Sequence, residues 1–314
     1  MALPSFIVIG AAKAGTTAMH GYLAEHPEVF MSEVKETNHF AYELDAAGNL
    51  VYGVPELHRF PVRSLTAYEN LFANIGAAKA AGETSPIYLE CPHTAERIRN
   101  TIPDVRIICG LRNPVDRAYS DYLMYLRGTG RQFDASRDLS VAAEWVQPDS
   151  HWMRVSCYHD LLKRYYDTFP RERIHIFLTG ELKRDPVRVV QDVYRFIGVD
   201  PGFTPDFDTP YNVGGLPASP LLERAFTAGA AIRHAVEPWV PRRTLKWMRR
   251  VRASNMQQAP ALPPELRAQL MEYFRDDIER TAELIGTSLD QWLVPPTRRP
   301  GQVPGIAPGA SHAM

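Results

Sequence analysis

The segment Phe6–Thr17, which reads FIVIGAAKAGTT, restricts the possible folds of this chain more than any other part of the sequence. Four apolar residues typical of a buried strand are followed by two glycines five residues apart and then by two threonines, where a helix can begin. In such a strand–loop–helix turn the backbone N–H groups point to one spot, and the helix dipole adds positive potential there. The segment therefore predicts a loop that binds an anion, and a phosphate group is its natural ligand.

The position of Lys13 distinguishes this loop from the loop of nucleotide triphosphatases. That loop reads G-x-x-x-x-G-K-[ST], with the lysine after the second glycine and a hydroxyl group that holds magnesium. Here Thr16 and Thr17 follow the second glycine, and the lysine lies inside the loop. The predicted strand Val105–Leu111 is followed by Arg112, not by an aspartate that could bind magnesium. The sequence thus predicts a phosphate-bearing donor that is activated by a lysine, without a metal.

A second anion site is predicted at Arg112. The arginine follows an apolar strand, at the edge where open α/β sheets bind their ligands, and its planar guanidinium suits a phosphate. Ser120 lies about two turns into the helix that follows, so its hydroxyl can bind the same anion. The alternative is a strand-end ion pair for Arg112 and a surface hydroxyl for Ser120.

Short apolar runs alternate with longer helical patterns, which is typical of an α/β fold with a central, mainly parallel sheet flanked by helices. The predicted strands are Phe6–Ile9, Val105–Leu111 and Arg173–Leu178. The predicted helices are Thr16–Glu25, Pro114–Arg127, His159–Phe169, Pro186–Ile197 and Pro264–Ile285. Asn113 and Asp185 each precede a proline, so both are expected to cap the helix that follows.

Length and composition indicate one domain. With 314 residues, 45% of them hydrophobic, the chain can bury a large core, and we expect a single domain over residues 1–293. Within it we expect a surface excursion at residues 131–156 and a Pro- and Gly-rich loop at 201–220. Residues 294–314 are poor in large apolar groups, which predicts a disordered tail. A net charge of −1 excludes a bulk basic surface for nucleic acid, so an anion site must be a local cluster.

Cysteine usage and hydropathy favour a cytoplasmic location. The three cysteines are far apart in the sequence, which argues against a disulfide scaffold or a cysteine-rich zinc site and favours a reducing compartment. The apolar run Phe6–Ile9 is shorter than the core of a signal peptide and much shorter than a membrane span.

These residues make a family recognisable. The chain resembles the sulfotransferases that use 3′-phosphoadenosine 5′-phosphosulfate, in particular a bacterial branch similar to the sulfotransferase domains that act on heparan sulfate. Phe6–Thr17 looks like the 5′-phosphosulfate loop of that family, and Leu111–Tyr122 looks like its 3′-phosphate segment. Weaker matches, which extend the resemblance over most of residues 5–293, are Gly82–Tyr88, Ser156–Tyr158, Glu181–Val199, Leu262–Arg267 and Leu289–Trp292.

The resemblance implies an in-line transfer of a sulfuryl group from this donor to a hydroxyl or amine of a carbohydrate, lipid or other small-molecule acceptor. Adenosine 3′,5′-bisphosphate is then the product, and no metal is required. Lys13 would stabilise the charge that grows on the bridging oxygen, and Arg112 with Ser120 would bind the 3′-phosphate. The donor-binding residues that the resemblance implies are Lys13, Ala14, Gly15, Thr16, Thr17, Arg112, Ser120, Tyr158, Gly214 and Gly215.

The base that accepts the proton of the acceptor is expected in the segment Ser32–Phe40. Relatives place a catalytic glutamate shortly before a His-Phe pair, and here Glu36 precedes His39 with one more residue between them than in the tightest form. Glu36 is the first choice and His39 is the alternative, since histidine titrates nearest to neutral pH. Lys35 either orients the acceptor or the donor sulfonate or is a surface lysine.

Further candidates have two interpretations each. Glu83 and Ser85 lie where relatives hold the acceptor, but a turn with a capping glutamate would look the same. Tyr158 packs either near the adenine or in the core. Gly214 and Gly215 either let the backbone approach the 3′-phosphate or belong to a plain loop.

The segment Pro238–Arg252 carries basic residues and no acidic one. One interpretation is a surface that binds an anionic membrane, a polyanionic acceptor or a lipid acceptor. The other is a solvated helix face.

Two other functions remain for the whole chain: a phosphate-loop kinase, and a non-catalytic nucleotide-binding protein. The sequence identifies neither the acceptor nor the oligomeric state.

Overall fold

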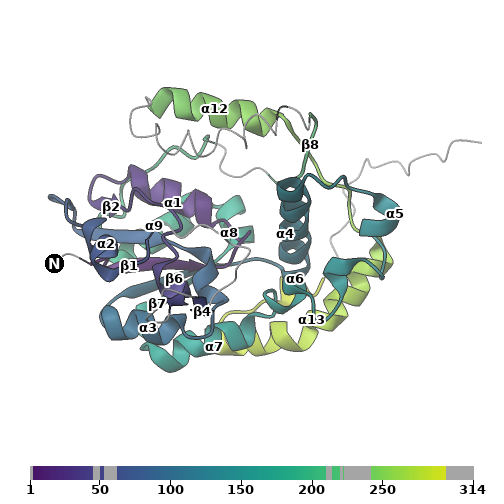
Figure 1. Cartoon of the computed structure of the whole chain (residues 1–314), viewed down its shortest axis with the longest axis horizontal. Coiled ribbons are helices and arrows are strands. Elements are labelled where there is room, and N and C mark those ends of the chain that lie inside the picture. Colours follow the sequence, from purple (N-terminus) through teal and green to yellow (C-terminus); the bar gives the residue numbers. More distant parts are fainter. Residues whose placement is uncertain are drawn as a thin grey trace, which may run out of the picture.

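The computed structural model describes residues 3–44, 50–52, 62–209, 214–219, 222 and 242–294. Its centre is a five-stranded sheet in the order β2-β5-β1-β6-β7, in which all neighbours are parallel. The strands of this sheet are β1 (Phe6–Gly10), β2 (Val29–Met31), β5 (Ala80–Thr84), β6 (Arg106–Leu111) and β7 (Ile174–Leu178). The predicted class, an α/β fold with a central parallel sheet flanked by helices, is confirmed (Figure 1).

The remaining elements connect or cover these strands. The helices are α1 (Thr16–Glu25), α2 (Leu65–Asn70), α3 (Thr94–Thr101), α4 (Pro114–Thr129), α5 (Ala135–Asp138), α6 (His151–Arg154), α7 (Tyr158–Thr168), α8 (Thr179–Arg184), α9 (Pro186–Ile197), α12 (Arg242–Ser254) and α13 (Pro264–Ile285). Single 3₁₀ turns are η1 (His39–Ala41), η2 (Pro86–Leu89), η3 (Glu144–Val146), η4 (Arg171–Arg173) and η6 (Asp290–Trp292). Two small antiparallel sheets pair β3 (Glu43–Leu44) with β4 (Leu50–Tyr52) and β8 (Leu216–Pro217) with β9 (Met256–Gln257).

The sheet separates two hydrophobic clusters because side chains alternate between the faces of a strand. Ile7 and Ile9 of β1 join the cluster formed with α3, α4, α7 and α13, while Phe6 and Val8 join the cluster formed with α1, α8 and α9. All five residues of β1 are buried, as expected of a strand in the middle of a parallel sheet. In Figure 1, α7 and α13 run along the lower edge, α1 lies above the sheet, and α12 lies at the top.

The predicted helix caps are confirmed. The Asn113 side chain accepts hydrogen bonds from the backbone N–H groups of Val115 and Asp116, and α4 begins at Pro114. The Asp185 side chain caps α9 in the same way, by accepting from the N–H of Arg188. Such caps satisfy N–H groups that have no partner inside the helix, so they fix where each helix begins.

The stretch 131–156, predicted as a surface excursion, has many exposed residues but also ordered, buried parts. This stretch forms α5, η3 and α6, and Trp145 within it is completely buried. The indole of Trp145 stacks near the ring of Tyr122 and donates a 2.8 Å hydrogen bond to the carbonyl of Asp138. Because each helical piece spans only three or four residues, it is too short to give the periodic pattern that reveals a longer helix.

Some predictions lie wholly or partly outside the described residues. These are the tail beyond Val294, residues 210–213 and 220 of the predicted loop, and Pro238–Pro241 of the basic segment. The domain limit at residue 293 stays a prediction. Within the part of the chain that the structure describes, no helix is both long and apolar enough to cross a membrane.

Candidate active site

The predicted anion-binding loop connects β1 to α1. Gly15 stands before the helix with φ 91° and has no side chain to cap it, so the first N–H groups of α1 receive no cap from this position. Thr16 and Thr17 form the first helical turn, as predicted. The N-terminal end of α1 therefore offers backbone donors and the positive end of the helix dipole to an anion beside the loop.

The loop packs closely on the neighbouring strands. A Cβ atom at Gly110 of β6 would lie 2.4 Å from Cζ of Phe177 and 2.8 Å from the carbonyl oxygen of Ala14, so only glycine fits there. The buried hydroxyl of Thr179, at the start of α8, donates to the carbonyls of Ala14 and Leu111 at 2.9 and 3.0 Å. The loop is thus fixed to β6 and β7. Sequence reasoning missed Thr179, although its place directly after strand β7 is a signal for a residue at the ligand edge.

Lys13 lies in this loop with φ 70°, in the left-handed region that is unfavourable for residues other than glycine. Its Nζ is 3.4 Å from Sδ of Met124 on α4, and it forms no ion pair with a described residue. Burial lowers the pKa of Lys13 to about 8; Asp121 opposes this effect and Arg127 adds to it. An anion placed in the loop would relieve this cost of desolvating the ammonium.

Arg112 lies against the same loop, since its Nη1 donates a 3.2 Å hydrogen bond to the carbonyl of Lys13. Burial lowers its pKa as well. Ser120, half-buried, lies one turn before Met124 on α4, and residues four apart share a helix face. The Lys13 contact of Met124 therefore indicates that Ser120 is on the side of α4 that faces the loop. The structure brings the two predicted anion-binding segments together at one edge of the sheet.

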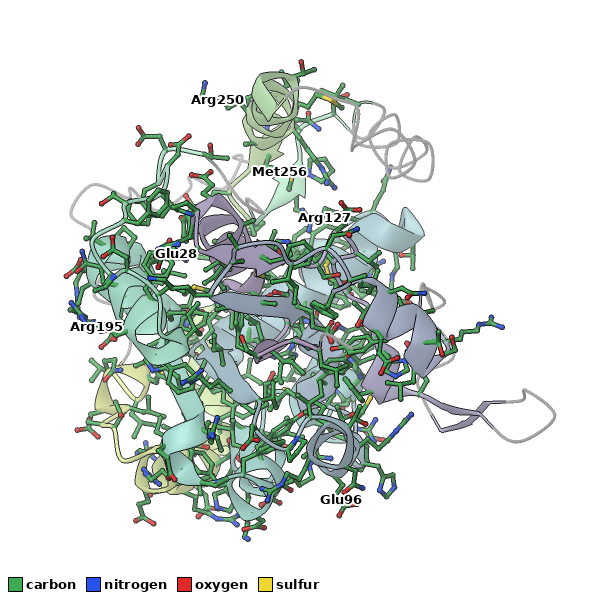
Figure 2. The ribbon with its side chains drawn as sticks, turned by 90° about the vertical axis from the view of Figure 1, so that its left-hand side faces the viewer. Glu28, Glu96, Arg127, Arg195, Arg250 and Met256 are labelled. Atoms are coloured by element: carbon green, nitrogen blue, oxygen red, sulfur yellow. The ribbon has the colours of Figure 1, made fainter. Side chains whose placement is uncertain are left out.

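Two further basic residues that sequence reasoning missed lie nearby. The pKa of Lys183 on α8 is lowered, first by burial and then by the charge of Arg112. Arg127 on α4 is close enough to Lys13 to lower the pKa of that lysine, and its Nη1 lies 3.8 Å from Sδ of Met256. Figure 2 shows Arg127, Met256 and Arg250 on the same side of the molecule, below and along α12. Their signal in the sequence is weak, because basic side chains are frequent on helix surfaces.

The candidate base segment begins beside the loop. Lys35 donates hydrogen bonds to Oγ1 of Thr17 at 3.1 Å and to Oε1 of Glu36 at 2.8 Å. The Glu36 side chain is 49% exposed, so an acceptor from solvent can reach it. The backbone of Glu36 is held in the left-handed region, at φ 61°, with its N–H bonded to the carbonyl of Thr84 at 2.9 Å. Residues in such conformations concentrate at functional sites.

His39, the alternative base, packs more deeply than Glu36. Its ring stacks on Tyr68 with centroids 4.7 Å apart, and its Nδ1 lies 3.3 Å from the carbonyl oxygen of Val62. Burial lowers the pKa of His39, which favours the neutral imidazole that a base requires. The described contacts connect Glu36 through Lys35 to Thr17, at the end of the β1–α1 loop, whereas those of His39 lead to Tyr68 and Val62.

Glu83 and Ser85 take a different place from the predicted one. Both side chains are fully buried, so in this structure an acceptor cannot contact them. Burial raises the pKa of Glu83, and hydrogen bonds from Thr37 and Tyr68 oppose that rise. The two residues lie beneath the base segment, in contact with Thr37 and Asn38.

The other candidates are placed as follows. Tyr158 is completely buried and donates a 2.9 Å hydrogen bond to the carbonyl of Arg112. Of its two interpretations, these contacts favour packing in the core. Gly215 has φ 129°, and a Cβ there would lie 2.0 Å from the carbonyl oxygen of Gln257. Glycine is thus required for the pairing of β8 with β9, and β8 packs on α4. Gly214 is exposed. Among the described residues, no cluster of three or more His, Cys, Asp or Glu could hold a metal ion.

A parallel α/β sheet with a glycine-containing loop after its central strand and an arginine after the next strand is an arrangement typical of proteins that bind phosphorylated ligands. Residues 4–205 match the model of the sulfotransferase family, and the chain belongs to that family. The predicted resemblance to the sulfotransferases is therefore confirmed. The kinase alternative is not favoured.

Individual relatives agree with this membership. The chain is 35% identical over 124 residues to the membrane-associated sulfotransferase kil1 of Dictyostelium discoideum. The matched residues are 39% of this chain and 23% of that protein. It is 26% identical over 212 residues to the bifunctional heparan sulfate N-deacetylase/N-sulfotransferase 4 of Mus musculus. This match covers 64% of this chain and 23% of that protein. The chain thus spans about a quarter of the length of these two relatives.

Among solved structures, a sulfotransferase from Alicyclobacillus acidocaldarius is similar over nearly the whole chain. The TM-score is 0.66 with 28% sequence identity, and the match covers 93% of this chain and 99% of the other. The fold described above therefore extends over nearly all of that structure.

Proposed function

We propose that the protein transfers the sulfuryl group of 3′-phosphoadenosine 5′-phosphosulfate to a hydroxyl or amine group of a carbohydrate acceptor. The observation that carries this proposal is the half-buried Lys13, whose pKa is lowered to about 8 and whose loop carbonyl accepts from Arg112. Two cations on adjacent loops suit a donor with two separate anionic groups. The heparan sulfate enzymes among the relatives support a carbohydrate as the acceptor, with lipids and other small molecules as further candidates.

In the proposed reaction the acceptor oxygen or nitrogen forms a bond to sulfur while the bond from sulfur to the bridging oxygen of the 5′-phosphate breaks. The electron pair of the broken bond stays on that oxygen, so negative charge grows there and Lys13 stabilises it. The acceptor loses its proton to the carboxylate of Glu36, which is exposed and lies beside the donor loop through Lys35. Adenosine 3′,5′-bisphosphate is the leaving group of the reaction. Arg112 and Ser120 bind its 3′-phosphate during the transfer.

Incubation with donor labelled in its sulfuryl group tests the proposal. Label should move to a carbohydrate fraction, in the presence of a chelator as well, and should move far more slowly with Lys13→Ala. Transfer that requires added magnesium would instead favour a kinase-like reaction. Binding of donor without transfer to any acceptor fraction would favour the non-catalytic alternative.

We also propose that the protein is cytoplasmic and that α12 contacts anionic lipid. The protein would then bind the inner face of a membrane. The helix contains six basic and no acidic residues, a composition that favours contact with an anionic surface. Cosedimentation with phosphatidylglycerol vesicles that weakens with salt supports this contact, and equal binding to phosphatidylcholine vesicles contradicts it.

A further inference from the structure

A buried carboxylate lies beneath the candidate base segment. Glu83, near the end of β5, is completely buried, and each of its two oxygens accepts two hydrogen bonds from hydroxyl groups. The donors to Oε2 are Thr37 at 2.6 Å and Ser85 at 2.8 Å. The donors to Oε1 are Tyr68 at 2.7 Å and Tyr88 at 3.0 Å.

This arrangement suits an ionised carboxylate. A carboxylate only accepts hydrogen bonds and has about four lone-pair sites, so four donated hydroxyl groups satisfy it. Burial raises the pKa of Glu83, while the hydrogen bonds from Thr37, Tyr68, Ser85 and Tyr88 lower it. A buried charge of this kind is stable only while all of its partners keep their geometry, which makes the cluster rigid.

The partners of Glu83 also hold the base segment. Thr37 belongs to that segment and follows Glu36 directly. Ser85 Oγ accepts a hydrogen bond from the N–H of Asn38 at 3.2 Å, and the Tyr88 hydroxyl accepts one from the N–H of Phe40 at 3.3 Å. Tyr68 reaches the segment differently, through the stacking of its ring on His39. Every residue from 37 to 40 therefore contacts Glu83 or one of its hydrogen-bond partners.

We propose that Glu83 is a positioning residue for sulfuryl transfer, which orients Glu36 and His39 toward the acceptor through this hydroxyl cluster. The proposal rests on the proposed function, in which one of those two residues accepts the proton. An exposed carboxylate such as Glu36 has many rotamers, so its place relative to the donor depends on how firmly its backbone is held. Glu83 and its partners hold residues 37–40, which directly follow Glu36, from the buried side.

The first test is Glu83→Gln, which keeps the size of the side chain but replaces one acceptor oxygen with a donor. We expect kcat to fall ~10²-fold, the effect of misplacing a catalytic group by about 1 Å. The dissociation constant of adenosine 3′,5′-bisphosphate should stay within about threefold of wild type, because the donor loop is attached to β6 and β7. A wild-type kcat in a folded Glu83→Gln variant overturns the proposal.

A matched pair of variants covers the case in which Glu83→Gln does not fold. Tyr88→Phe and Tyr68→Phe each remove one hydroxyl that donates to the same oxygen of Glu83, from equally buried rings. Only the Tyr88 hydroxyl also bonds to the backbone of the base segment, whereas the ring in Tyr68→Phe would keep its stacking on His39. We expect kcat to fall ~10-fold in Tyr88→Phe, the worth of one hydrogen bond, and to fall less than about threefold in Tyr68→Phe.

Equal losses in the two tyrosine variants would mean that the cluster only stabilises the fold, and would overturn the positioning role. The failure of the proposed function has a different signature, since wild-type protein would then transfer no label to any acceptor. Thermal unfolding of both variants, recorded beside the kinetics, should show similar loss of stability despite the different effects on kcat.

Discussion

The ammonium of Lys35 donates a 3.1 Å hydrogen bond to the hydroxyl of Thr17, and thereby connects the segment after β2 to the first turn of α1. The same ammonium lies 2.8 Å from the Glu36 carboxylate. A cation therefore lies between the loop proposed for the donor and the proposed base. Both side chains of the ion pair are partly exposed, so we expect it to orient the groups more than to stabilise the fold.

Adenosine 3′,5′-bisphosphate should stabilise the fold more than AMP does, because Arg112 and Ser120 would bind the 3′-phosphate that AMP lacks. At about 100-fold over its dissociation constant the ligand should add ~2.7 kcal/mol to the free energy of unfolding. Thermal shifts measured for wild type and for Arg112→Ala check this. Equal shifts with the two nucleotides would contradict a separate 3′-phosphate site.

Lys13→Ala should lower turnover by ~10²–10³-fold, the effect of removing one preorganised donor, and should lower donor affinity much less. The reason is that the charge on the bridging oxygen is largest in the transition state. Steady-state kinetics and calorimetric binding of the bisphosphate separate the two effects. A large loss of affinity with unchanged turnover would mean that Lys13 only binds.

Binding of the donor product should take up a proton at alkaline pH. The pKa of Lys13 is about 8 in the free protein, so at pH 9 the side chain is mostly neutral, and an anion beside it favours the charged form. Affinity should therefore fall as pH rises above about 8, by up to about tenfold per pH unit. Calorimetry at pH 9 in two buffers of different ionisation enthalpy measures the uptake. Uptake that persists in Lys13→Met would place the titrating group elsewhere.

The same pKa shift has a consequence for the free protein. Because folding lowers the pKa of Lys13 from its usual 10.5, the unfolded chain binds more protons between pH 8 and 10.5. The contribution of Lys13 to stability is thus unfavourable below pH 8 and disappears as the pH rises toward 10.5.

Glu36→Gln should lower turnover ~10²–10⁴-fold, the range of general base catalysis, because the amide cannot accept the acceptor proton. His39→Asn should cost less if the ring only supports the segment by stacking on Tyr68. Turnover at saturating donor, measured from about pH 5.5 to 9, compares the two variants. An inactive His39→Asn beside an active Glu36→Gln would reverse the roles.

Thr179→Val should destabilise the protein by ~1–3 kcal/mol, since the buried carbonyls of Ala14 and Leu111 would lose a donor. It should also weaken binding of the bisphosphate, because the loop would lose its link to α8. Thr281→Val is the control: the Thr281 hydroxyl is buried and finds no partner in the described structure. Urea unfolding should show a loss only in the first variant; equal stabilities would mean that the Thr179 bonds contribute nothing.

Local signals made much of the fold predictable. The predicted bounds of α1, α9 and α13 equal the observed ones, because a glycine, a proline or a capping residue marks where each helix begins. The β1–α1 loop and Arg112 were also predictable, since each directly follows an apolar strand. Strand β5 was not, because its sequence AAGET lacks the branched and aromatic residues typical of strands at all but its last position.

The packing of distant segments could not be predicted. Glu83 has the composition of a surface residue, and its burial arises only when Thr37, Tyr68 and Tyr88 meet around it. The same holds for Trp145, whose stacking partner Tyr122 belongs to a different helix far earlier in the sequence. No spacing within either segment indicates these partners.

Gly110 brings the carbonyl of Ala14 directly against β6, and this close approach has a kinetic consequence. The loop backbone is ordered by the sheet when the chain folds, so little ordering remains for the moment at which the donor arrives. Association should then require no slow rearrangement and should follow electrostatic steering by Lys13, Arg112 and Lys183, with a rate constant that decreases as ionic strength increases.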